Sequence, residues 1–447
     1  MQKIIFRYIL NIRANGYYDS KHEEELMSDN REKIIRNFSE EIKHAYESDA
    51  KVMSADRELR FCFELQRKRL AQKRLTCTEE MTHRGQFPNG LNKVRSWHDG
   101  RYETTWAVDF IDHMKTYSRD GVLLYKKKQK QSIYETVVDV QGDEDVSSDK
   151  YCCPNCGATS TIAALQEGCP HCGTSFKMSE LYPKVSNFFY VYDEGGTGKE
   201  LFQKVLKYGL CLLPLTCIFI LWTGYSKDGI LPVDYIKNPG QLIKMIIGLI
   251  VTAPIVGFFG WFLSIWLRFI KMLLTDLPLL FSIMASRKAF AYNMSRICPE
   301  YTFERFSARM MSLLKIVAYS DRDEDLPFYK GPDLGSLFDD VADITFRGMA
   351  TCKRVREKGN MVYVTADLYV ETAHDRGNKI KVKKETYRVT AGRRLDVPFA
   401  SNFSITEVEC RSCGGSFNVY KKNKCPYCGT EYEPEYADWA LYDIQKK

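Results

Sequence analysis

Two long runs of apolar residues lie near the middle of the chain. The first, 208–226, holds nineteen residues without a charge, and the second, 245–267, holds twenty-three. A bilayer core of ~30 Å is crossed by about 20 residues of helix, so both runs predict transmembrane helices. Trp261 and Trp266 lie toward one end of the second run, where interfacial aromatic residues are common. A pair of buried helices in a soluble protein is the alternative, which the length of the runs disfavours.

Basic residues flank the two runs on the sides that join the large outer regions of the chain. They are Lys199, Lys204 and Lys207 before the first run and Arg268, Lys271, Arg287 and Lys288 after the second. The loop 227–244 between the runs mixes lysines with acidic residues. The positive-inside rule therefore predicts an external loop and a multi-pass protein of the cell membrane with both termini cytoplasmic.

The segment 268–297 after the second run stays apolar with sparse charges, and Pro278 can begin a helix there. Such a pattern predicts a helix along the membrane surface. A continuation of the second span that packs into the following domain is an equally weighted alternative.

Outside the apolar runs, hydrophobic and polar positions alternate over short stretches, which predicts β-strands. Two such stretches, 106–110 and 362–368, are each followed by a turn and a lysine-rich strand. The lysines are Lys126, Lys127, Lys128 and Lys130 in one strand and Lys379, Lys381, Lys383 and Lys384 at the other. They predict the solvated face of an exposed strand, or alternatively a surface for anionic membrane lipids.

Eight of the 15 cysteines form four Cys-x-x-Cys pairs, grouped as two sets of two. Each set offers four thiolates, the closed tetrahedral shell of a structural Zn²⁺ site, while iron or a redox dithiol is the alternative. A glycine follows each pair, and His171 between two cysteines is expected to be a bystander. The predicted ligands are Cys153, Cys156, Cys169 and Cys172 in one zinc ribbon and Cys410, Cys413, Cys425 and Cys428 in the other. Reduced thiols agree with a cytosolic location.

The two ribbons belong to a longer internal repeat. Cys153 and Cys410 lie 257 positions apart, Cys169 and Cys425 lie 256 apart, and the turns before the lysine strands keep the same offset. We infer a duplicated unit of helices, an antiparallel sheet and a ribbon, with one copy on each side of the apolar runs.

The second half opens with the helix motif Cys298-Pro-Glu-Tyr-Thr-Phe-Glu-Arg-Phe306, followed by apolar positions at helical spacing and by strands to Val389. This order resembles bacterial membrane proteins that carry a Tim44-like domain, of the NTF2-like α+β fold, with an appended zinc ribbon. The resemblance covers Cys298 to Ile444, although the usual leading aspartate is Cys298 here. It implies a sheet around an apolar pocket, a membrane-recruited adaptor role and no catalytic residues. It also predicts that Trp439 to Leu441 returns as a strand after the ribbon.

The predicted fold class is therefore α+β, with two NTF2-like/Tim44-like lobes, each followed by a four-cysteine zinc ribbon, flanking a two-helix transmembrane hairpin. The predicted regions are an N-terminal lobe at 1–148, a ribbon at 149–178, a linker at 179–207, a span at 208–226, an external loop at 227–244, a span at 245–267, a membrane-proximal helix at 268–297, the Tim44-like domain at 298–407, a ribbon at 408–432 and a closing strand and tail at 433–447.

Other charged motifs favour no chemistry. The segment from Asp193 to Lys199 is similar to the end of a phosphate-binding loop, but Asp193 replaces the first glycine and Glu200 replaces the hydroxyl residue. The acidic groups 321–325 and 339–340 are expected at the surface, without nearby histidines. The basic residues Arg67, Arg69, Lys73 and Arg74 of an N-terminal helix are expected to face solvent.

Three functions remain open at this point. The favoured one is a non-enzymatic scaffold that binds an unidentified protein or an apolar peptide close to membrane lipids, with a homo-oligomer possible. The second is a lipid or small-molecule binding protein, conceivably an enzyme, that uses the NTF2-like pocket. The third is a membrane-tethered nucleic acid binder, which the modest net charge of +7 does not demand.

Overall fold

The computed structural model describes residues 29–47, 51–83, 92–99, 101–142, 144–192, 198–229, 231–271, 273–274, 277–298, 301–320, 326, 328–397, 407–419, 424–436 and 438–447. The predictions for 193–197 and 321–325 lie outside them. The chain forms a hairpin unit, which comprises Glu194–Ser282, and an α+β unit, which comprises Gln2–Asp193 and Ile283–Lys447. The predicted mixture of helix and sheet is confirmed.

The hairpin unit consists of α6 (Gly198–Asp228), α7 (Pro232–Lys237) and α8 (Pro239–Lys271). Within α6 and α8, the segments Val205–Ser226 and Pro239–Leu267 are long and apolar enough to cross a membrane. Both helices extend beyond the predicted spans, because a charge-free run marks only the part that suits lipid, whereas the helix continues through its charged ends. Many of their apolar side chains, such as Phe219 and Ile250, are exposed.

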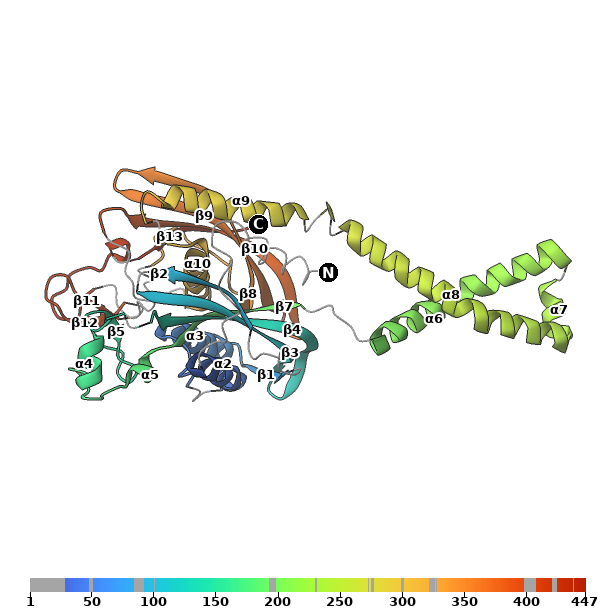
Figure 1. The fold of residues 1–447 in the computed structure, drawn as a ribbon, viewed down its shortest axis with the longest axis horizontal. Helices are drawn as coiled ribbons and strands as arrows, with labels where there is room; N and C mark the ends of the chain where they lie inside the picture. The colour runs from blue at the N-terminus through green and yellow to red at the C-terminus, as the bar shows by residue number, and fades with distance from the viewer. Residues whose placement is uncertain are drawn as a thin grey trace. The chain divides into compact units, whose positions relative to one another are not determined.

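Small residues hold α6 and α8 together as an antiparallel pair (Figure 1). A Cβ atom added to Gly257 would lie 2.6 Å from the carbonyl oxygen of Val205 and 2.8 Å from the amide nitrogen of Gly209. Farther along, Gly248 of α8 approaches Ile220 of α6, so the two helices run in opposite directions. The backbones meet where glycine leaves room, as is common between helices in membranes.

The first half of the α+β unit places helices before an antiparallel sheet with the strand order β1-β3-β4-β7, in which β2 also pairs with β3. Its elements are α2 (Asp29–Glu41), η1 (Ile42–His44), α3 (Arg57–Gln72), β1 (Leu75–His83), β2 (Asn92–Asp99), β3 (Tyr102–Arg119), β4 (Val122–Val140) and β7 (Lys184–Tyr192). Strand β7 corrects the predicted linker at 179–207. Val185, Phe188 and Phe189 are buried there, so the strand is covered on both faces and lacks a simple alternation.

The second half repeats this arrangement with the strand order β13-β10-β9-β8. Its elements are α10 (Phe303–Tyr319), β8 (Val341–Lys358), β9 (Met361–Asp375), β10 (Ile380–Arg394) and β13 (Ala440–Lys446). In each half, a long hairpin leads to a ribbon and then to a closing strand that pairs with the second hairpin strand. The predicted return of the chain as a strand after the second ribbon is confirmed.

The two halves share one core instead of forming separate lobes. Phe189 of β7 stacks on Tyr134 of β4 at 5.1 Å between ring centroids and meets Phe346 of β8 edge-on at 5.8 Å. Gly348 of β8, with φ of +69°, lies directly against the Phe189 ring. Buried residues of both halves therefore belong to one hydrophobic cluster.

Helix α9 (Leu277–Met294) is the element found in the predicted membrane-proximal segment. Ile283, Phe290 and Met294 are buried, and the ring of Phe290 lies 5.3 Å from that of Phe303 and 5.2 Å from that of Phe306. The end of α9 thus packs into the α+β unit, as in the second alternative, although α9 is a helix separate from α8.

Candidate metal centres

The first ribbon is built from two tight cysteine turns between short elements. These elements are β5 (Lys150–Cys152), β6 (Thr159–Thr161), α4 (Ile162–Glu167) and α5 (Met178–Leu181). The amide of Gly157 donates to the carbonyl oxygen of Cys153 at 2.9 Å, and Gly173 repeats this contact with Cys169 at 2.8 Å. Both glycines have positive φ, +82° and +72°, a conformation that other residues rarely adopt.

The second ribbon has the same geometry: its first cysteine turn lies between β11 (Glu407–Glu409) and β12 (Ser416–Asn418), and its second turn follows β12. Gly414 donates to Cys410 at 2.8 Å and Gly429 donates to Cys425 at 2.9 Å. The repeat found in the sequence therefore extends to individual backbone hydrogen bonds.

All eight predicted cysteines come together in two groups of four, and the Sγ atoms of each group lie within 4.8 Å of one another. The distance from Cys153 to Cys172 is 3.7 Å, as is that from Cys156 to Cys169. In the second ribbon, Cys410 lies 3.5 Å from Cys428, and Cys413 lies 3.6 Å from Cys425. A tetrahedron with metal–sulfur bonds of about 2.3 Å has edges of about 3.8 Å, so both groups fit a metal ion.

A threonine hydroxyl beside one sulfur atom of each group favours the thiolate of that cysteine. The hydroxyl of Thr174 lies 3.4 Å from the Cys172 sulfur, and its hydrogen bond lowers the pKa of Cys172 to about 6. Thr430 has the same relation to Cys428, at 3.2 Å, and also lowers the pKa of that thiol to about 6. His171 is exposed and is not part of the first group, so four sulfur atoms alone form each donor set.

The two ribbons are supported differently. Ribbon 1 packs in its own cluster around Tyr102, Tyr151 and Tyr182, whereas Phe417 of ribbon 2 belongs to the core shared by the two halves. The ribbons touch each other, because the amide of Thr159 donates to the Ser416 hydroxyl at 3.1 Å.

A buried charge cluster joins the two halves at a place that the sequence did not indicate. Lys115 of β3 lies 2.6 Å from Glu79 of β1 and 2.6 Å from Asp343 of β8. Tyr117 and Gln66 also donate to Asp343, at 2.8 and 2.7 Å. The cavity within this cluster measures only about 10 Å³, which is at the lower limit for one water molecule.

The charges in this cluster stabilise one another. Burial opposes ionisation of Glu79 and Asp343, but Lys115 holds the pKa of each carboxyl below its usual value. Burial likewise disfavours the ammonium of Lys115, but Asp343 and Glu79 raise its pKa well above the usual value. The cluster thus acts as an ionic joint between the halves.

Of the basic residues at the end of α3 that were predicted to face solvent, only Arg74 is exposed, and Arg67 donates to the backbone oxygen of Ala45 at 2.8 Å. Arg69 donates to the backbone oxygen of Phe338 at 2.6 Å, and Lys73 donates to that of Asp339 at 2.5 Å. The side chains of Arg69 and Lys73 both contact the second half. Their carbonyl partners are distant in sequence and become neighbours only in the folded chain.

The acidic pair 339–340 also departs from its prediction. Asp339 is exposed, but Asp340 is only half-exposed and lies 3.0 Å from His374 and 3.0 Å from Arg376. The other ring nitrogen of His374 contacts Glu385 at 2.9 Å. Asp340 directly precedes β8, which pairs with β9 at His374, so a histidine distant in sequence becomes a neighbour.

The lysine strands occupy open stretches of sheet. Lys126, Lys127 and Lys128 are exposed on the part of β4 that precedes its pairing with β7, which begins at Gln131. Lys381 and Lys384 are exposed on β10 before its pairing with β13 begins at Tyr387. Exposed lysines at such positions discourage pairing with another chain, in agreement with the solvated-face prediction.

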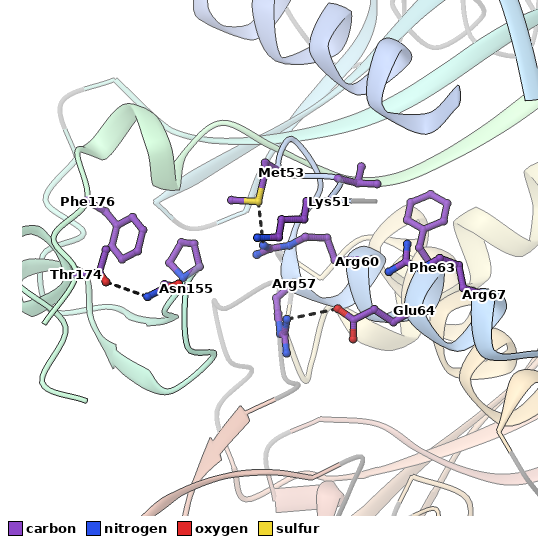
Figure 2. Close-up of a pocket in the computed structure, with 12 residues that line it drawn as sticks. Lys51, Met53, Arg57, Arg60, Phe63, Glu64, Arg67, Asn155, Thr174 and Phe176 are labelled. Carbon is purple, nitrogen blue, oxygen red and sulfur yellow. Dashed lines mark hydrogen bonds and ion pairs between the residues drawn. The ribbon is translucent and has the colours of Figure 1, made fainter. Parts of the chain in front are cut away.

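A cavity of about 550 Å³ lies between α3 and ribbon 1 and was not predicted from the sequence (Figure 2). Arg57, Arg60 and Arg67 line it from α3, and Pro154 and Asn155 line it from the first cysteine turn. Spacings of three and seven residues along α3 put these arginines on one helix face, a signal that was present in the sequence.

Comparison with known proteins found no match: no family model, curated protein or solved structure matches the chain.

Proposed function

We propose that the protein is a membrane-anchored scaffold whose α+β unit is stabilised by two Zn²⁺ ions and holds a protein or an apolar peptide near the bilayer. Zinc suits donor sets of four thiolates with tetrahedral spacing, and a closed set leaves no coordination position for a substrate. Structural metal and a membrane anchor are the features that this proposal combines.

The core shared by the two halves is the observation that carries the proposal. Segments before α6 and after α8 belong to one compact unit, in which Lys115 bridges to Asp343 and Phe189 packs on Phe346. If α6 and α8 cross the bilayer, they must therefore leave and return on the same side. The excess of lysine and arginine on that side supports a cytosolic α+β unit, with the loop around α7 outside.

A compact unit tied to a membrane on one side suits partner recruitment more than catalysis. Its ionic joint is closed, since the cavity there is at the limit for one water molecule. The lysine-rich strands supply a surface on which membrane lipids or an acidic partner can rest. The Tim44-like resemblance, with its adaptor role, agrees with this proposal.

The test is crosslinking in native membranes followed by purification of the full-length chain in mild detergent. We expect one protein partner to be enriched over a control that uses an unrelated protein with two membrane spans. A chain that stays monomeric, with no protein enriched after crosslinking, would contradict the scaffold.

The membrane arrangement needs its own test. We expect a membrane-impermeant maleimide to label Val233→Cys on α7 in intact cells, whereas Asn378→Cys in the β9–β10 turn should need permeabilised cells. Labelling of both variants in intact cells would contradict a cytosolic α+β unit.

A further inference from the structure

The cavity between α3 and ribbon 1 carries an excess of positive charge. Lys51, Arg57, Arg60 and Arg67 line it, and Glu64 is the one carboxylate among the lining residues (Figure 2). The guanidinium of Arg57 lies 3.7 Å from Glu64, too far for a hydrogen bond. Four cations and one carboxylate therefore line the same space.

Arg57 and Arg60 have donor groups to spare, whereas Arg67 donates to the backbone oxygen of Ala45 at 2.8 Å. The Nε–H of Arg57 is buried and makes no hydrogen bond. Arg60 is 9% exposed, and its nearest polar contacts are the Asp56 backbone oxygen at 3.4 Å and the Met53 sulfur at 3.8 Å. Both contacts are weak, whereas a planar guanidinium binds two oxygen atoms of a phosphate well.

Burial disfavours the charges of the enclosed cations. It lowers the pKa of Arg60, and Arg57 adds to this lowering, whereas Tyr151, Asp56 and Glu64 oppose it. Burial, followed by the charge of Arg60, lowers the pKa of Lys184 to about 8; its amine donates to the backbone oxygen of Met53. An anion beside Arg60 would offset part of this cost of burial.

The remaining wall is apolar. Val52 and Phe63 are buried lining residues, and Phe176 of ribbon 1 lies on the side of the cavity opposite Phe63 in Figure 2. Asn155 is held by a hydrogen bond from its amide to Thr174 at 3.0 Å. The volume of about 550 Å³ lies within the range of small-molecule sites.

We propose that this cavity binds an amphipathic phosphate ester, with the phosphate among Lys51, Arg57 and Arg60 and an aromatic or apolar group against Phe176. This site is independent of the scaffold function, because it lies within the first half and involves neither a protein partner nor the membrane spans. A soluble nucleotide and a phospholipid headgroup are the two sources of such chemistry.

The test titrates the full-length protein in non-ionic detergent by calorimetry with three probes: ADP, dihexanoyl phosphatidylglycerol and inorganic pyrophosphate. We expect one of the two esters to bind, and its identity assigns the source. Pyrophosphate should bind about tenfold more weakly, because it lacks the apolar group. No ester binding at ~1 mM, or equal binding of pyrophosphate, would overturn the proposal.

Variants locate the site. Arg57→Gln and Lys51→Gln should each weaken the ester about tenfold or more, and Phe176→Ala should weaken the ester but not pyrophosphate. Lys51 is exposed and Arg57 is partly exposed, so both variants should keep the wild-type melting temperature. Lys128→Gln removes the same charge on β4, away from the cavity, and should leave binding unchanged. Unaltered ester binding by the double variant Lys51→Gln, Arg57→Gln would overturn the assignment.

Discussion

Helices α3 and α10 hold equivalent places in the two halves, but their surroundings differ. Nearly all of α10 is buried, including Glu304, Arg309 and Lys315. Helix α3 buries one face against α10, where Glu58 pairs with Arg309, and turns its arginine face to the cavity beside ribbon 1. The same supersecondary unit therefore supplies the centre of the structure in one copy and an open surface in the other.

The ribbons differ in the same sense. Ribbon 2 continues the shared core, since Phe417 meets Tyr432 edge-on at 6.2 Å and Tyr432 lies 6.1 Å from Phe328. Ribbon 1 has a separate cluster and contributes Pro154 and Asn155 to the cavity. After duplication, one copy thus forms the centre of the fold while the other keeps a surface open to a ligand.

Loss of a metal ligand should break this comparison most strongly. Metal binding at a four-thiolate site contributes on the order of 10 kcal/mol to the stability of small zinc domains. We expect Cys425→Ser to lower the melting temperature of the whole α+β unit, because ribbon 2 is continuous with the shared core. Cys169→Ser should mainly unfold ribbon 1, with a smaller shift. Scanning fluorimetry in mild detergent measures both, and equal shifts would contradict the difference between the ribbons.

The ionic joint is expected to give the next largest effect. Lys115→Met leaves Glu79 and Asp343 buried without their cation, which should cost about 3–5 kcal/mol. Chemical denaturation of the detergent-solubilised chain measures the loss. Lys128→Met, which removes a 69% exposed lysine 3.9 Å from Asp112, should cost less than about 1 kcal/mol. If Lys115→Met proved as stable as Lys128→Met, the charges of the ionic joint would not hold the halves together.

The contact between the halves at Gly348 can be tested by adding one methyl group. In Gly348→Ala the new Cβ atom would need to displace the Phe189 ring, and the residue would keep a φ of +69°. We expect a loss of about 2–4 kcal/mol in unfolding experiments. Gly377→Ala has a similar φ, +79°, but open space around its Cβ atom, and should cost about 1 kcal/mol. Similar losses of stability for both variants would contradict a contribution from packing between Gly348 and Phe189.

The smallest expected effect is a pH dependence of stability that arises from one carboxyl group in the first half. Burial raises the pKa of Glu135 to about 8, against a lowering effect of its hydrogen bond from Ser39. Because the folded chain keeps a proton that the unfolded chain loses from pH 4.5 upward, stability should fall between pH 4.5 and about 8 and then level off.

Replacement of this carboxyl sharpens that prediction. Glu135→Gln should be more stable than wild type at pH 8, by about 1–3 kcal/mol, and closer to wild type at pH 5. The exposed Glu80→Gln on β1 is the control and should change stability by less than about 0.5 kcal/mol. A difference at pH 8 no larger than that at pH 5 would contradict the protonated state of Glu135.

Features with a local pattern could be predicted from the sequence. The two long helices follow from charge-free runs, the cysteine groups from their spacing, and the long hairpins from alternation around Trp106 and Val362. The repeat was visible because the cysteines and the turns keep a constant offset. In each case the residues that form the feature are close together in the chain or repeated in it.

Features that depend on distant neighbours could not be predicted. Strand β7 has no alternation because the second half covers it, and Lys115 and Asp343 lie 228 positions apart. Arg69 and Lys73 look solvated in a helical pattern, but their partners are carbonyl groups of the other half. The cavity needs both a helix face and a cysteine turn, which the chain brings together only on folding.

Metal content per chain tests the duplicated architecture most directly. The full-length protein is purified in mild detergent without chelators, and its metal content is measured by elemental mass spectrometry. The wild type should contain two zinc ions per chain, and the variants Cys169→Ser and Cys425→Ser should each contain one. Fewer than two zinc ions in the wild type, or iron in their place, would contradict a structural zinc site in each copy.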